Sequence, residues 1–392
     1  MEKNILEKAN EIHDQLVAWR RDFHMHPEVG FHEFRTSEKV AETLTKFGVN
    51  FKKGIGRTGV VADIGSGSPV IAIRADMDAL PLQEKNDVIY ASQNPGVMHA
   101  CGHDSHTAML LGVAELLIKE TFSGTVRLLF QPSEEVADEE GVSGAPRMIE
   151  DGAMHGVDMV IALHVSPFVP TGQIQVDAGP GSGGVDSWFG RIIGKGGHGA
   201  SPHKTVDPFY ISGHVIMALN GIVSRRMDPI FPAVVSIGSI NGGHTENVIP
   251  EHVDITGTLR YTKEDVHKVL HEEIRRSFEL ARTLGGDYQL RFEIGDPPMV
   301  NDQQAVDLIS SAAADLIGVE NIKPMDKGLG AEDFGRFSAI APGAMFSLGA
   351  LITGDERIGH NPHFDIDENA LPIGTAILVE AALRFLRQGK LG

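Results

Sequence analysis

Two stretches that cannot continue a helix or a strand divide this chain of 392 residues. The first is Gly179-Pro180-Gly181-Ser182-Gly183-Gly184, and the second is Asp296-Pro297-Pro298. Runs of glycine and proline interrupt regular structure, and a chain of this length exceeds what one ordinary hydrophobic core holds. We therefore predict a discontinuous domain, residues 1–182 and 297–392, with a second domain, residues 183–296, inserted between its two parts.

The part before the first break alternates short apolar runs with longer amphipathic stretches. The expected helices are residues 5–20, 36–47 and 104–120, and the expected strands are residues 58–63, 70–75, 125–130 and 158–163. In the first helix, Ile5, Ala9 and Ile12 recur at helical spacing. Strands that alternate with helices are typical of a layered α/β sheet. The part after the second break returns to helices and short strands and is predicted to complete the same domain.

The inserted part has a different order of elements. Its expected strands are residues 187–194, 232–240, 252–260 and 287–294, and its expected helices are residues 205–226 and 262–284. This order is typical of a compact two-layer α+β domain. The residues 194–199 also satisfy the spacing of the dinucleotide-binding fingerprint, which needs a helix beginning inside the loop. Pro202 and Pro208 postpone any helix here, so we interpret the match as accidental.

Charge and cysteine content limit the partners of this chain. Lys and Arg number 34 against 53 Asp and Glu, which gives a formal net charge of -19. Such a surface repels nucleic acid and anionic membranes, so neither is expected as a partner. The chain has a single cysteine and hence no internal disulfide, and no run approaches the ~20 apolar residues of a membrane span. We expect a cytoplasmic location.

Side chains that bind metals follow several of the expected strands. Asp76 and His164 each come directly after a strand, and Glu134 and Glu135 follow a third strand after Pro132. Ligands gather at the carboxyl ends of strands in open α/β sheets. We therefore expect these side chains to lie at one edge of the sheet.

The single cysteine, Cys101, lies among histidines in the stretch His99-Ala100-Cys101-Gly102-His103-Asp104. Alone, Cys101 would be interpreted as a buried apolar side chain, and Glu134-Glu135 as a solvated acidic loop. Together, thiolate, imidazole and carboxylate groups are typical of zinc and related ions. A spare carboxylate beside them is what a metal-assisted hydrolase needs to handle the proton of its water.

Five motifs resemble the signatures of one known family. In chain order they are His24-Met25-His26-Pro27-Glu28, Arg74-Ala75-Asp76-Met77-Asp78-Ala79-Leu80-Pro81, Met98-His99-Ala100-Cys101-Gly102-His103-Asp104, Gln131-Pro132-Ser133-Glu134-Glu135 and His360-Asn361-Pro362. They resemble the aminoacylase/carboxypeptidase G-type metallopeptidases, in the branch of hippurate hydrolases, bacterial N-acyl-amino-acid amidohydrolases and plant auxin-conjugate hydrolases. The resemblance implies an α/β fold, with a layered di-metal catalytic domain and an inserted α+β, ferredoxin-like lid and dimerisation domain.

The resemblance also implies a metal centre with two divalent ions. Its expected ligands are Cys101, His103, Glu135, His164 and His360. Cys101 would bridge the two ions, and Glu134 would be the general base. Zinc or manganese is expected, and cobalt and nickel also suit these ligands.

At two positions of this centre the sequence allows more than one assignment. In other branches of the superfamily a histidine ligand stands where this chain has Asp76. We therefore expect Asp76 to orient a ligand imidazole rather than to bind metal. His363 lies close to His360, and we favour His360 because the family pattern places the ligand directly before Asn361-Pro362.

The inserted domain carries three further candidates, His198, Asn247 and Arg260. The resemblance implies that His198 reaches the active site of a second subunit in a homodimer and polarises the scissile carbonyl. Asn247 and Arg260 would hold the substrate carboxylate, which arginine pairs with bidentately. Alternatively, His198 is a turn residue and Arg260 a surface charge at a strand end.

The predicted reaction is metal-dependent hydrolysis of an N-acyl-L-amino acid to a carboxylate and a free amino acid. N-acetyl, benzoyl and similar aryl-acyl groups all remain open, because the residues of the acyl pocket are not visible in the sequence. One alternative is a dipeptidase of the same superfamily. Another is a metal-binding homologue without catalytic activity.

Overall fold

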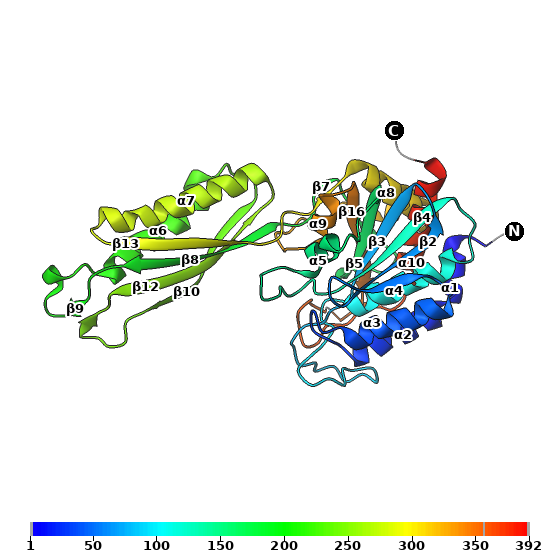
Figure 1. The fold of residues 1–392 in the computed structure, drawn as a ribbon, viewed down its shortest axis with the longest axis horizontal. Coiled ribbons are helices and arrows are strands. Elements are labelled where there is room, and N and C mark those ends of the chain that lie inside the picture. The colour runs from blue at the N-terminus through cyan, green and yellow to red at the C-terminus, as the bar shows by residue number, and fades with distance from the viewer. Residues whose placement is uncertain (1–2, 356, 390–392) are drawn as a thin grey trace. The chain divides into compact units, whose positions relative to one another are not determined.

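The computed structural model describes residues 3–355 and 357–389, and the chain folds into two compact units (Figure 1). The first unit holds the described residues up to 181, together with 300–326 and those from 333 onward. The second unit holds residues 182–299 and 327–332. The predicted α/β class is confirmed, with a large mixed sheet in the first unit and a smaller sheet in the second.

An eight-stranded sheet in the order β1-β2-β4-β3-β5-β16-β6-β15 forms the centre of the first unit. Its strands are β1 (Phe51–Ile55), β2 (Gly59–Ser66), β3 (Val70–Asp76), β4 (Gly124–Gln131), β5 (Met159–Pro170), β6 (Ile174–Gln175), β15 (Ile322–Lys323) and β16 (Gly343–Leu351). The central strands β4, β3, β5 and β16 are parallel. Their nearly continuous apolar sequence reflects burial on both faces of the sheet.

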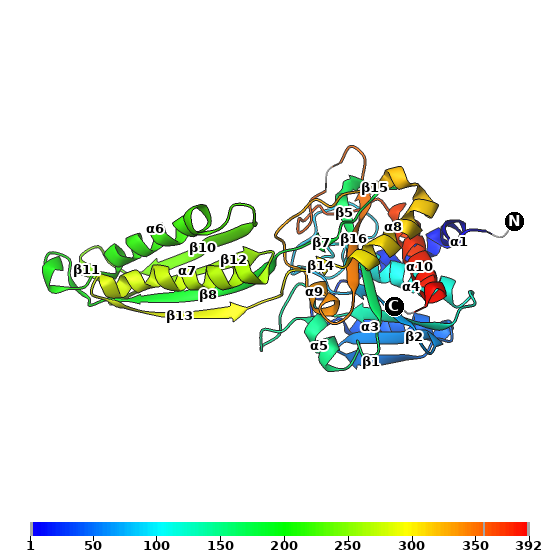
Figure 2. The same ribbon diagram turned by 90° about the horizontal axis from the view of Figure 1, so that it is seen from above.

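The helices of the first unit are α1 (Ile5–Glu11), α2 (His13–Met25), α3 (Phe34–Lys46), α4 (His103–Leu117), α5 (Gly144–Glu150), α8 (Gln303–Ile317), α9 (Phe334–Ser338) and α10 (Ala370–Gln388). Helix α4 packs against β3 and also contacts α2 and α10; Figure 2 shows α4 beside α10. Nearly every side chain of α4 is therefore buried. A short ribbon of β7 (Gly179–Pro180) and β14 (Val300–Asn301) completes this unit.

Two predicted elements of the first unit differ most from the structure. The expected helix at 5–20 is two helices, because the backbone leaves helical geometry at Ile12 (φ -103°, ψ 12°). The expected strand at 158–163 continues as β5 to Pro170, since its pairing with β16 carries on beyond Leu163. His164 consequently lies inside a strand, opposite Ser347, and not after its end.

The second unit is a four-stranded antiparallel sheet in the order β10-β12-β8-β13, with two helices packed on it. Its elements are β8 (Gly184–Ile193), β9 (Gly197–His198), α6 (Pro208–Arg226), β10 (Ala233–Gly242), β11 (Val248–Ile249), β12 (His252–Tyr261), α7 (Glu264–Thr283) and β13 (Asp287–Ile294). Trp188 and Phe278 centre the core between the sheet and the helices. Helix α6 begins at Pro208, later than expected, because Asp207 caps it by accepting from the Phe209 N–H at 2.8 Å.

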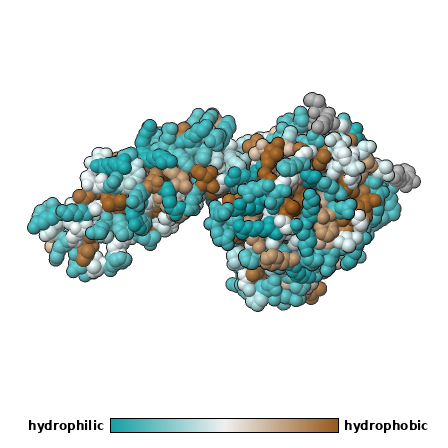
Figure 3. Space-filling model, in the orientation of Figure 1, coloured by the Kyte–Doolittle hydropathy of each residue, from teal (hydrophilic) through white to brown (hydrophobic). Residues whose placement is uncertain are grey.

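Hydrophilic residues cover most of the face shown in Figure 3, and hydrophobic residues are scattered among them. This agrees with the formal net charge of -19. Among residues 3–355 and 357–389, no helix combines the length and the apolar character that crossing a membrane requires.

Candidate metal centre

The parallel strands of the first unit bring separate sequence motifs to one edge of the sheet. Asp76 ends β3, and it lies opposite Gln131, the last residue of β4. Glu134 and Glu135 follow Gln131 after a short turn. Because β5 pairs with the other side of β3, its residue His164 reaches the same region. These side chains lie at one edge of the sheet, as expected, because of the order of the strands, although they are far apart in the sequence.

Cys101 faces His164 directly. Its Sγ lies 3.4 Å from His164 Nε2, and the Val165 carbonyl accepts from Nδ1 of the same ring at 2.8 Å. Burial raises the pKa of the Cys101 thiol, but His164 and His103 outweigh this and lower the pKa to about 6. The thiolate, which is the metal-binding form of cysteine, is thus accessible near neutral pH.

A second group joins Cys101 to Glu135 and His360. Glu135 Oε1 lies 3.0 Å from His360 Nε2, and the ligand atoms of all three residues lie within 4.8 Å of one another. His360 has φ of 58°, a strained conformation for a residue other than glycine. Its N–H donates to the Ala100 carbonyl at 2.7 Å, which fixes it beside the loop that carries Cys101.

His363, the alternative to His360, has a different environment. Like His360 it is exposed, but its N–H donates to Asn361 Oδ1 at 2.9 Å, and its carbonyl accepts from Arg357 Nη1 at 2.5 Å. These backbone contacts shape the loop, whereas the side chain of His360 faces the cluster. The geometry therefore supports the choice of His360.

Cys101 also forms a group with His103 and His164 whose ligand atoms lie within 4.8 Å of one another. The two groups share one sulfur, so all the expected ligands meet around it: Cys101, His103, Glu135, His164 and His360. Thiolate, imidazole and carboxylate atoms in two overlapping groups would suit a pair of divalent ions.

The hydrogen bonds of the His103 ring show whether this side chain suits a metal ion. Its Nδ1 lies 3.0 Å from the Asp78 carbonyl and 3.2 Å from Asp78 Oδ1, both of which only accept. Its Nε2 is buried and has no hydrogen-bond partner among the described residues. A buried polar atom without a partner is costly, and a lone pair on Nε2 directed at a metal removes that cost. The described residues fit the metal.

Asp76 contacts an imidazole that the sequence did not single out. Its Oδ1 accepts from His106 Nδ1 at 2.6 Å, and His106 Nε2 in turn accepts from the Val165 N–H at 2.9 Å. His103 is farther away, with 3.6 Å between its Nε2 and Asp76 Oδ2. Burial opposes ionisation of Asp76, but Arg74 and the histidines hold its pKa well below the ordinary range. The orienting role of Asp76 toward a ligand stays a prediction; its closest imidazole is His106.

Glu134 and Glu135 follow a strained turn. Ser133 has φ of 45°, and its N–H donates to the buried Glu33 carboxylate at 2.8 Å. The N–H of Glu135 donates to Asp78 Oδ2 at 3.0 Å. Carboxylates of Glu134 and Glu135 reach a common point with His103, with ligand atoms within 4.8 Å of one another. Glu134 therefore lies beside the ligand group, where a base must be.

Hydrogen bonds among buried polar side chains fix the carboxyl ends of β3 and β4. Arg74 donates from Nε to Gln131 Oε1 at 2.6 Å and from Nη2 to Asp333 Oδ1 at 3.0 Å. Asp333 also accepts from Ser143 Oγ at 2.8 Å. Sequence reasoning missed Asp333, because nothing in its neighbourhood marks a residue so far along the chain.

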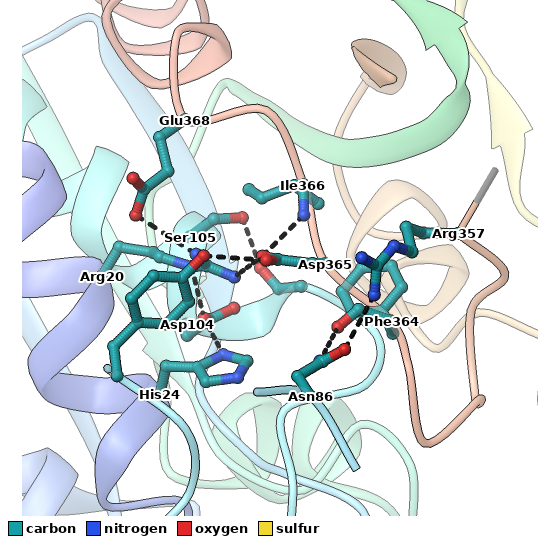
Figure 4. Close-up of polar contacts among 12 residues, drawn as sticks. Arg20, His24, Asn86, Asp104, Ser105, Arg357, Phe364, Asp365, Ile366 and Glu368 are labelled. Carbon is teal, nitrogen blue, oxygen red and sulfur yellow. Dashed lines mark hydrogen bonds and ion pairs between the residues drawn. The ribbon is translucent and has the colours of Figure 1, made fainter. Parts of the chain in front are cut away.

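A second buried network surrounds the first turn of α4 (Figure 4). Asp104 Oδ2 accepts from Arg20 Nε at 2.9 Å and contacts His24 Nδ1 at 2.7 Å. Arg20 also pairs with Asp365 and Glu368, at 2.7 and 3.2 Å. This network ties α2 and α4 to the segment that follows His360. The sequence signal was present, since His24 and Asp104 lie in two of the quoted motifs, but it did not reveal their contact.

The three candidates of the inserted part lie in the second unit. His198 is exposed on β9, opposite Val248 of β11, and its neighbour Gly199 donates its N–H to the Asn247 carbonyl at 2.8 Å. His198 and Asn247 thus share one short ribbon. Arg260 is on β12 and donates from Nη1 to Thr258 Oγ1 at 2.5 Å.

A mixed α/β fold with overlapping thiolate, imidazole and carboxylate groups suits a metal-dependent hydrolase with a dinuclear centre. Comparison with known proteins agrees: residues 72–384 match peptidase family M20/M25/M40, and the chain belongs to this family.

Two relatives and one solved structure illustrate the similarity. Thermostable carboxypeptidase 1 of Saccharolobus solfataricus is 40% identical over 96% of this chain and 97% of its own length. The N-acyl-L-amino acid amidohydrolase of Geobacillus stearothermophilus is 42% identical over 75% of this chain and 80% of its own. A dinuclear metal-binding M20 peptidase of Bacillus subtilis superposes with a TM-score of 0.84 at 33% identity, over 96% and 99% of the two chains.

Proposed function

We propose that this protein hydrolyses the amide bond of N-acyl-L-amino acids and releases a carboxylate and a free amino acid. The observation that carries this proposal is the pair of ligand groups that share Cys101, with Glu134 beside them. The 42% identity to an N-acyl-L-amino acid amidohydrolase supports the substrate class. Acetyl, benzoyl and similar aryl-acyl groups are the candidates for the acyl part.

The metal ligands in this proposal are Cys101, His103, Glu135, His164 and His360. They would hold two divalent ions, zinc or manganese, with cobalt and nickel compatible with the same donors. Such ions lower the pKa of water toward ~7 and polarise a carbonyl. Glu134 accepts the proton of the attacking water at its carboxylate and returns it to the leaving nitrogen.

In this proposal the residues that bind the substrate belong to the second unit. Asn247 and Arg260 bind the carboxylate of the amino-acid part, with the guanidinium supplying charge-assisted hydrogen bonds. His198 donates to the carbonyl oxygen as negative charge develops on it. In this proposal the protein is a homodimer through the second unit, and His198 of one subunit serves the active site of the other. The cytoplasmic location stays a prediction.

A second activity is peptide hydrolysis. The 40% identity to a thermostable carboxypeptidase over nearly the whole chain favours it, and a dipeptidase would use the same metal groups and Glu134. Substrates of the two activities differ on the acyl side of the scissile amide, since the acyl part of a dipeptide carries a charged amino group. Membership of peptidase family M20/M25/M40 and the hydrolase relatives argue against the non-catalytic alternative.

A substrate panel separates these activities. Release of free amine is measured from N-acetyl, N-benzoyl and indoleacetyl amino acids and from dipeptides, with metal-loaded enzyme and with chelator-treated enzyme. We expect acyl-amino acids to be cleaved, the chelator to abolish cleavage, and added Zn²⁺ or Mn²⁺ to restore it. Faster cleavage of dipeptides than of every acyl-amino acid would overturn the proposal in favour of the peptidase.

A further inference from the structure

A second group of metal-binding side chains lies wholly within the second unit. Asp186 is on β8, the strand that lies between β12 and β13, and His267 and His271 are on α7 (Figure 1). The two histidines are four residues apart, so they project from the same face of the helix, one turn from each other. Their Nε2 atoms lie 2.6 and 2.5 Å from a single atom, Asp186 Oδ2.

Aromatic neighbours fix both imidazole rings. His267 is stacked on Tyr261 with centroids 4.2 Å apart and planes at 15°. His271 is stacked on Phe292 at 4.0 Å and 20°. The two rings meet edge to face at 76°, so their Nε2 atoms converge without a change of rotamer. Such preorganisation is what a metal site requires of its imidazoles.

A buried carboxylate occupies the position expected of a ligand. The side chain of Asp186 is fully buried, and its Oδ1 accepts from the Gly295 N–H at 3.2 Å. That bond leaves Oδ2 directed at the histidines. Behind His267, Glu264 Oε2 lies 3.7 Å from Nδ1. This distance exceeds a hydrogen bond and the Glu264 side chain is 66% exposed, so the stacked rings and Asp186, rather than Glu264, fix the imidazoles.

We propose that Asp186, His267 and His271 bind one first-row divalent metal ion, for which Zn²⁺ is the representative. Two imidazoles and one carboxylate are a common zinc donor set with three protein ligands and one open position. Their three ligand atoms already lie within 4.8 Å of one another. Zinc bonds of ~2.0–2.2 Å in a tetrahedron separate ligands by roughly 3.3 Å, so each ring would move by less than about 1 Å.

The site is also accessible from solvent. The side chains of His267 and His271 are 14% and 15% exposed, so an ion can enter from their side, and water can fill the open position. Binding replaces the protons through which both Nε2 atoms bond to Asp186. The ion would join α7 to the central strand β8. It acts in the second unit and takes no part in the hydrolysis proposed above.

Zinc content provides the first test. Full-length protein is dialysed against micromolar free Zn²⁺, and zinc per chain is measured by mass spectrometry for wild type, His267→Gln and His271→Gln. Both variants are expected to hold one zinc fewer than wild type. The matched control is His252→Gln, an exposed histidine of the same unit, which should retain the wild-type number. Equal zinc content in wild type and both variants would overturn the site.

A second measurement does not depend on variants that fold. Crystals of the wild-type protein grown with Zn²⁺ are measured on both sides of the zinc absorption edge. The proposal expects an anomalous peak between Asp186, His267 and His271, in addition to any at Cys101. A peak at Cys101 with none at Asp186 would refute it, and would leave the hydrolase proposal untouched.

Discussion

The carboxylate of Asp78 lies 3.2 Å from Nδ1 of His103, through Oδ1. Its other oxygen, Oδ2, accepts from the N–H of Glu135 at 3.0 Å. The buried side chain of Asp78 thereby positions two of the expected ligands, His103 and Glu135, which come from different motifs. The contact fixes the tautomer of His103 and directs its Nε2 at the cluster.

Replacing Asp78 should therefore weaken metal binding. In Asp78→Asn the amide oxygen can still accept one hydrogen bond. The amide NH₂ then faces the other N–H donor, of His103 or Glu135, and cannot accept from it. We expect metal affinity to fall about 10–100-fold, measured by competition with a chelator of known affinity. Asp63→Asn, at an exposed carboxylate paired with Arg127, is the control and should bind metal as wild type does. Equal affinities for both variants would remove Asp78 from the centre.

Removing the base should stop turnover without emptying the centre. For Glu134→Gln we expect kcat to fall about 10²–10⁴-fold, with metal content close to that of wild type. The control is Glu139→Gln, an exposed residue of the following loop, which should keep full activity. If Glu134→Gln retained normal turnover, another residue would have to act as the base.

Arg260 should affect substrate binding more than turnover. A charge-assisted hydrogen bond contributes about 1.5–3 kcal/mol, so Arg260→Ala should raise KM about tenfold or more while kcat changes little. Arg191→Ala removes an exposed arginine that pairs with Asp254 on the neighbouring strand, and it should leave KM unchanged. Steady-state kinetics on the best acyl-amino acid measures both. An unchanged KM in Arg260→Ala would contradict the carboxylate role.

Gly102 should tolerate no side chain. Its φ is 94°, and a Cβ there would lie 2.3 Å from Val165 Cγ2. Gly96 has φ of 79° with nothing within 4 Å of its Cβ position, so Gly96→Ala measures the backbone strain alone. We expect both substitutions to lower Tm in chelator, and Gly102→Ala to cost about 1–3 kcal/mol more through overpacking. Equal losses of Tm in the two variants would show that the Val165 side chain moves away from the added methyl group without cost.

Glu33 should make stability depend on pH. Burial and the nearby Asp78 raise its pKa from 4.5 to about 7. Between these values the folded protein holds a proton that the unfolded chain loses, so the free energy of unfolding falls as pH rises, by up to about 3 kcal/mol. Glu33→Gln lacks this penalty.

Calorimetry at pH 5 and pH 8 tests this expectation. The Tm of Glu33→Gln, relative to wild type, should be higher at pH 8 than at pH 5. Glu42→Gln, an exposed residue of α3, removes the same charge without burial and should show no such change. A pH-independent difference for Glu33→Gln would show that this carboxyl ionises normally.

The sequence by itself determined the α/β class and the residue types of the centre. Alternating apolar runs follow from burial of strands between helices, and the motifs around Cys101, Glu134 and His360 carried the chemistry. Local patterns also located most helices, because capping and helical spacing act over a few residues, as at Asn4 before α1.

Only the tertiary structure decided which groups meet. Packing of α4 on β3 brings His106 to Asp76. Arg74 on β3 likewise meets Asp333, 259 residues further along the chain. The grouping of Asp186 with two histidines of α7 likewise depends on how that helix lies on the sheet. No local preference encodes such contacts, because their energy comes from burial and from hydrogen bonds that exist only once distant segments have packed.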